Sequence, residues 1–209
     1  MKDTKNIGVP GSLEDAEDAA DRRAPGALAR LVHHRWALPA LAQVAAEGGC
    51  KFITLQKRLG VAPQRLKVTL QRLESMELVV PNPSYGHPMR PEYVLGDLGT
   101  EVSEPAQRLI SWMRRADVER PLLKKWSLPA LSAMGLGARR FSEISSLLTR
   151  ATSRATTLAL KDLVAVELAE RRVGEGFPPT THYTPLRRAR LALRHAHAIG
   201  KPLVLAGWV

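Results

Sequence analysis

The sequence predicts a mainly α-helical protein with small β-hairpins, of the α+β class, built from two tandem copies of one unit. The composition is that of a globular protein, because 44% of its 209 residues are apolar and 24% are charged. A tryptophan-led segment recurs after 90 residues, and each copy is followed by the same order of helical and strand-like patterns. A Pro- and Gly-rich stretch late in each copy predicts a hairpin there.

The internal repeat begins at two matching tryptophans. Residues 36–41 (WALPAL) recur as 126–131 (WSLPAL) at an offset of 90, with one residue lost near 48–49 and regained near 150. The later matches pair Phe52 with Phe141, Leu70 with Leu160, Leu73 with Leu163, and Tyr93 with Tyr183. Matches that keep their order, with shifts only where loops tolerate them, indicate a duplicated unit.

Three segments are expected along the chain. Residues 1–25 are acidic and are expected to form a mobile N-terminal arm, with a transient helix over 13–23. The first unit then covers 26–116, and the second covers 117–209. The apolar stretch from residue 202 onward is expected to pack on a neighbour rather than to hang free.

The elements of the first unit follow from periodicity and from Pro and Gly. Leu66, Leu70 and Leu73 recur at helical spacing and form one apolar stripe, and Pro63 suits the first turn of that helix. The expected elements are a helix over 31–46, a short helix near 53–59, the longer helix from 63, strands over 78–80 and 92–95, and a closing helix over 98–115.

The second unit repeats this order. Thr152 or Ser153 is a candidate cap for its longer helix, in which Leu160 and Leu163 face inward. The expected elements are a helix over 122–134, a short helix near 141–148, the longer helix from 153, strands over 168–173 and 182–184, and a closing helix over 186–199. Three helices, a hairpin and a helix form a winged helix-turn-helix, whose third helix fits a major groove about 12 Å wide.

The residues that fill this pattern resemble the HxlR family of bacterial winged-helix transcriptional regulators. In the second unit the resemblance rests on Lys125-Trp126, Arg140-Phe141 with Glu143-Ile144, Pro178-Pro179 and Tyr183. The first unit is similar as a more diverged copy, through Arg35-Trp36, Lys51-Phe52, Pro88 and Tyr93, so that most of 31–199 is covered.

Several expectations follow from the resemblance. Members of the family are usually single-domain homodimers on palindromic operators, so two units in one chain imply a covalent pseudo-dimer, with linkage that makes the second contact intramolecular. Many members sense oxidants or aldehydes through a cysteine just before the first domain helix. His33-His34 occupy that region here, and the single cysteine, Cys50, lies after the helix. Thiol sensing of that type is therefore not expected.

Candidate DNA contacts lie on the third helices and on the hairpins. Steps of 100° per residue place polar side chains opposite the apolar stripe, where glutamine suits adenine, and lysine or arginine suits guanine or phosphate. Val68 and Leu158 either touch thymine methyls or mark a face for a protein or small molecule, and Asp162, opposite Arg72, weakens the second unit as a reader. The candidates are Gln64, Arg65, Lys67, Val68, Gln71, Arg72, His87 and Arg90 in the first unit, and Arg154, Thr157, Leu158, Lys161, Arg171 and Arg172 in the second.

The charge favours a polyanionic partner, because 31 Lys and Arg against 20 Asp and Glu give a net charge of +11. No apolar leader or bilayer-length stretch is present, so a cytoplasmic protein without membrane contact is expected. Motifs for catalysis or cofactor binding are also missing, which argues against an enzyme. His195 and His197 would point apart on a helix, so no metal site is expected.

Further partners and functions stay open. Trp36 and Trp126 are expected in the core, with a small-molecule effector cleft between the core and the terminal helices as the alternative. A second copy of the chain is another candidate partner. A repressor that occludes its operator is the first hypothesis. The alternatives are a winged-helix protein-interaction module and a plasmid-type replication initiator, which would bind iterated repeats.

Overall fold

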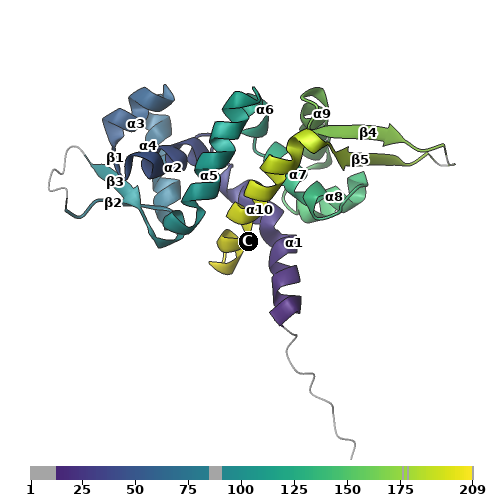
Figure 1. The fold of residues 1–209 in the computed structure, drawn as a ribbon, viewed down its shortest axis with the longest axis horizontal. Coiled ribbons are helices and arrows are strands. Elements are labelled where there is room, and N and C mark those ends of the chain that lie inside the picture. Colours follow the sequence, from purple (N-terminus) through teal and green to yellow (C-terminus); the bar gives the residue numbers. More distant parts are fainter. Residues whose placement is uncertain (1–12, 85–90, 176, 178, 209) are drawn as a thin grey trace, which may run out of the picture.

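The structure is a computed structural model that describes residues 13–84, 91–175, 177 and 179–208 (Figure 1). Helices dominate it, and two small antiparallel sheets accompany them. In chain order the elements are α1 (Leu13–Leu31), α2 (Ala37–Glu47), β1 (Cys50–Lys51), α3 (Phe52–Leu59), α4 (Pro63–Ser75), β2 (Val79–Pro81), β3 (Glu92–Leu95), α5 (Asp97–Arg115), α6 (Glu119–Leu122), α7 (Ser127–Gly135), α8 (Phe141–Leu147), α9 (Ser153–Ala165), β4 (Ala169–Val173), β5 (Thr181–Pro185), the 3-10 helix η1 (Arg187–Ala189) and α10 (Arg190–Leu205).

The two winged units share one backbone plan, as the sequence predicts. The apolar stripe of α4 is buried through Leu66, Leu70 and Leu73, and that of α9 is buried through Leu160 and Leu163. Both helices are followed by the same left-handed turn, in which Glu77 and Glu167 each have a φ of 56°. The amide after each turn donates back to the helix at 2.9 Å, from Leu78 to Leu73 and from Leu168 to Leu163. The duplication therefore extends to the details of the main chain.

The sheets differ slightly between the units. In the first unit β3 lies between β1 and β2, and Cys50 pairs with Tyr93. The strand β1 was not expected from the sequence, since two residues carry no alternation pattern. In the second unit β4 pairs with β5 alone, and an isolated bridge between Arg140 and His182 stands where β1 would lie.

The helices expected over 31–46 and 122–134 are wrong at their first turns. The first begins at Ala37, after a turn over 32–36 in which the Ala37 amide donates to the His34 carbonyl at 2.8 Å. The polar run 33–35 interrupts the apolar periodicity there. The second is likewise split, with α6 ending at Leu122 and α7 beginning at Ser127.

Helices α1, α5 and α10 form the centre of the molecule, with one winged unit on each side and the hairpins directed to opposite ends (Figure 1). Helix α1 packs on α10, α7 and α8, so it belongs to the first unit by sequence but lies against the second. Helix α5 packs on α2 and crosses α10. The centre thus joins both units into one body.

The acidic segment expected as an arm over 1–25 is described from Leu13 onward, and residues 1–12 lie outside the described residues. From Leu13 onward it is part of the 19-residue α1, and the expected boundary at 25/26 lies inside that helix. Its inner face is alanine-rich, with Ala20 and Ala24 buried against α10. A Cβ added to Gly200 would lie 2.9 Å from the Ala24 Cβ, so the two helices approach closely. The alanines between the acidic residues form a packing face, which the acidic composition of the segment did not indicate.

Candidate nucleic-acid interface

The outer face of α4 presents the residues that the periodicity predicted. Burial of Leu66, Leu70 and Leu73 turns the opposite side of the helix to solvent, and Pro63 occupies its first turn. The exposed residues of this face are Gln64, Arg65, Lys67, Val68 and Gln71. The face therefore offers amide and cationic groups around one apolar side chain, a set that can bond base edges and phosphates.

The outer face of α9 is the counterpart. The Thr152 hydroxyl caps the helix by accepting from the Ala155 amide at 3.2 Å. The Thr157 hydroxyl donates to the Ser153 carbonyl at 2.8 Å, which leaves its oxygen free to accept. Exposed on this face are Arg154, Thr157, Leu158 and Lys161.

Arg72 lies apart from the other candidates of α4. Its side chain is half-buried, and its guanidinium sits 5.5 Å from the ring centroid of Trp208. Its counterpart Asp162 accepts from the Lys124 ammonium at 2.7 and 2.8 Å, one bond to each carboxylate oxygen. The structure thus directs the C-terminal end of α4 toward the centre of the molecule.

The hairpin candidates are described only in part. Arg171 and Arg172 lie on β4 and are exposed, and the Arg172 Nε is 2.8 Å from a Glu170 oxygen. Hydrogen bonding to Glu170, with the attraction of its charge, raises the pKa of Arg172. His87 and Arg90 of the first hairpin lie outside the described residues.

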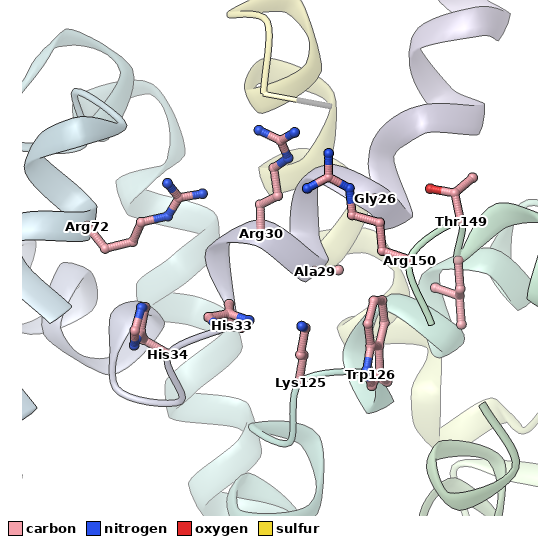
Figure 2. A pocket seen from close by; sticks show the side chains of 11 residues that line it. Gly26, Ala29, Arg30, His33, His34, Arg72, Lys125, Trp126, Thr149 and Arg150 are labelled. Atoms are coloured by element: carbon pink, nitrogen blue, oxygen red, sulfur yellow. The ribbon is translucent and has the colours of Figure 1, made fainter. Parts of the chain in front are cut away.

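A cavity of about 480 Å³ opens between the units (Figure 2). It is bounded by α1, the 32–36 turn, α4, the turn before α7 and the loop before α9, and Trp126 forms part of its wall. Six basic residues line it: Arg30, His33, His34, Arg72, Lys125 and Arg150. Sequence reasoning missed this set, because the six residues come from four stretches that lie far apart along the chain. The sequence features that pointed to this cavity were the His33-His34 pair, the extra residue near Arg150 and the cleft expected beside the tryptophans.

The single cysteine is not arranged as a reactive thiol. Cys50 is buried, and its Sγ is 3.3 Å from a Glu47 oxygen. Burial, followed by the hydrogen bond and charge of Glu47, raises the pKa of the thiol to about 12. Since the thiolate is the nucleophile, this environment disfavours oxidant or aldehyde sensing at Cys50.

The histidines and carboxylates of the described part of the chain do not form a metal-binding cluster. No group of three or more His, Cys, Asp and Glu side chains there is placed to hold a metal ion. His195 is buried on α10, where burial and then the charges of Arg194 and Arg108 lower its pKa. Within the same residues, no helix is both long and apolar enough to cross a membrane.

Comparison with known proteins gives one match. A profile of the HxlR-like helix-turn-helix family matches residues 31–119 and 122–190, one segment in each copy of the repeat. Comparison with the curated proteins and with the solved structures gives no match. The profile therefore recognises both winged units, including the more diverged first one.

Proposed function

This chain belongs to the HxlR-like helix-turn-helix family of DNA-binding transcription regulators, and on that premise we propose that it binds a specific double-stranded operator as a covalent pseudo-dimer. The observation that carries the proposal is the pair of exposed polar faces on α4 and α9, at matching positions of two winged units. In this proposal each face reads one major-groove segment, and Arg171 and Arg172 hold phosphates.

The central helices support two faces at a fixed separation. Helix α10 packs on both α1 and α5, α5 packs on α2 of the first unit, and α1 packs on α7 and α8 of the second. Arg188, which precedes α10, adds a cross-link: its Nη2 donates to the Ala116 carbonyl, at the end of α5, at 2.7 Å. A rigid centre favours the pseudo-dimer, because the second face then needs no separate association step.

The two faces are chemically different, which favours an asymmetric operator. The exposed basic residues on the outer face of α4 are Arg65 and Lys67, whereas those of α9 are Arg154 and Lys161, at other positions along the helix. Two half-sites of unequal sequence, one helical turn or about 34–36 Å apart, are the expected target. Binding there represses transcription by occlusion, without a catalytic step.

A polarisation titration tests the proposal. The full chain is titrated against duplex DNA from upstream of its own gene and against a scrambled duplex, over a range of salt concentrations. We expect preference for the upstream duplex, a falling slope of log K against log salt, and a stoichiometry of one chain per site. An insertion of about five base pairs between the half-sites should abolish the preference, because it rotates one half-site by about half a turn. Equal affinity for both duplexes would refute the proposal.

One observation favours a second candidate, a protein-interaction module. Val68 and Leu158 are 39% and 52% exposed, and they occupy the same place in the centre of each face. Apolar residues at such a place also suit a protein partner. In that case, Val68→Asn with Leu158→Asn would abolish partner binding in a chain that shows no salt-dependent DNA affinity. Sedimentation of the DNA-free chain tests self-association of two copies.

A further inference from the structure

The cavity between the units concentrates positive charge. Figure 2 shows the Arg72 side chain on one side and Arg150 on the other, with Lys125 pointing in between them. Among the described residues none of its six basic side chains forms an ion pair with a carboxylate, and no acidic residue lines the cavity. Elsewhere in the molecule arginines and lysines find such partners, as Lys124 does with Asp162.

The basic groups act on one another. Burial and then the charges of Arg150 and Arg72 lower the pKa of Arg30. Burial and then Lys125, His34 and Arg72 lower the pKa of His33, and burial with Arg72 lowers that of His34. The charged forms of these three groups are thus disfavoured by burial and by their basic neighbours, and a bound anion would relieve that repulsion.

The size and wall of the cavity limit the ligand. A volume of about 480 Å³ is that of a small-molecule site, larger than a single phosphate needs. The half-buried ring of Trp126 gives one flat apolar surface, over which the Lys125 ammonium lies 4.8 Å from the centroid. Three arginines suit phosphate or carboxylate groups, which they can bind through paired hydrogen bonds.

The charge of the cavity also breaks the symmetry of the duplication. Arg72 corresponds to Asp162, and Arg150 lies near the point where the offset between the units returns to 90. His33 and His34 correspond to Leu123 and Lys124. Basic residues that serve only solubility can be spread over the surface. Their location around one cavity, at positions that are not equivalent in the two units, therefore favours a binding site.

We propose that this cavity is a binding site for a small organic anion with two or more negative charges, carried by phosphate or carboxylate groups. Arg30, Arg72 and Arg150 bind the charged groups, and Trp126 covers the body of the molecule. Because α4 carries Arg72 and the loop entering α9 carries Arg150, the ligand bridges the two reading helices. This regulatory step rests on the proposed function: the bound anion sets the separation of the helices and so changes operator affinity.

Calorimetric titration of the full chain without DNA tests the site. Pyrophosphate serves as the phosphate probe and citrate as the carboxylate probe, each at an ionic strength held constant with sodium chloride. We expect saturable binding of one anion per chain for at least one probe. Arg150→Gln should weaken it about tenfold or more, since a charge-assisted hydrogen bond is removed. Arg115→Gln removes an exposed charge from the end of α5, outside the cavity, and should leave binding unchanged.

The outcomes separate this proposal from the preceding one. Absence of saturable binding by both probes, or equal binding by wild type and Arg150→Gln, would overturn the anion site. Loss of DNA affinity in Arg150→Gln without any anion binding would assign the cavity to the DNA backbone and overturn it as well. Anion binding by a chain that prefers no duplex would refute the proposed function and leave the site standing. With both intact, the probe should change operator affinity in wild type and not in Arg150→Gln.

Discussion

The two winged units differ least where they are buried and most where they are exposed. Leu70 and Leu160 fill the same place in their cores, and the turns at Glu77 and Glu167 have the same φ. On the outer faces of α4 and α9, by contrast, Gln64 is replaced by Arg154 and Gln71 by Lys161. Packing constrains the buried positions of both copies equally, whereas the surface is free to diverge. The proposed operator with two unequal half-sites would require such a difference between the two faces.

The largest expected effect comes from reversing charge on one face at a time. Arg65→Glu with Lys67→Glu on α4, and Arg154→Glu with Lys161→Glu on α9, should each lower operator affinity by about 100-fold or more, because cationic contacts become repulsive. Polarisation titration at one salt concentration measures both. If reversal on α9 leaves affinity unchanged, only the first unit reads DNA and the pseudo-dimer is wrong.

The cores should respond alike. Leu70→Ala and Leu160→Ala each remove a fully buried side chain, and each should lower the free energy of unfolding by about 2–5 kcal/mol. Urea unfolding followed by circular dichroism measures the change. A destabilisation by only one of the two variants, or two separate unfolding transitions in wild type, would show that the two units do not unfold as one cooperative unit.

A position where the units differ in the interior sharpens the comparison. Ile110 of α5 corresponds to Gly200 of α10. A Cβ added to Gly200 would lie 2.9 Å from the Ala24 Cβ of α1. Gly200→Ile should therefore lower the free energy of unfolding by about 1–3 kcal/mol through overpacking. Ile110→Val shortens the corresponding side chain of the first unit, and it should lower the free energy of unfolding by about 0.5–1.5 kcal/mol. Thermal melts of both variants check this order, and a neutral Gly200→Ile would contradict the close packing of α1.

The smallest expected effect concerns pH. The folded pKa values of His33 and His34 are lowered by burial and by neighbouring cations, so the unfolded chain binds protons first as pH falls. Stability should decrease as pH drops below about 6.5 and level off below the folded values. His33→Gln with His34→Gln should reduce that decrease, and His195, whose pKa is also lowered by burial, should contribute to the part that remains. Urea midpoints at pH 7 and pH 5 measure it, and a larger decrease in the variant would have the wrong sign.

The sequence predicted the repeat, the winged units and the exposed faces, because these depend on local periodicity. Leu66, Leu70 and Leu73 alone orient α4. The position of α1 was not predictable in this way, since its partners on α10 lie far along the chain and its alanines give a weak apolar signal. The cavity was not predicted for a similar reason, because Arg72 and Arg150 come together only after the whole chain has folded.

The placement of α1 has a consequence for how the protein is made. Synthesis proceeds from the N-terminus at about 5–20 residues per second, so on the order of 10 s pass between the completion of residues 13–31 and that of 190–205. During that interval the alanine stripe of α1 has no permanent partner, since α7, α8 and α10 have yet to leave the ribosome. Although it is translated before them, α1 therefore docks only after these helices are complete, and Glu17 and Asp21 gain their basic partners on α10, Lys201 and His197, at that late step.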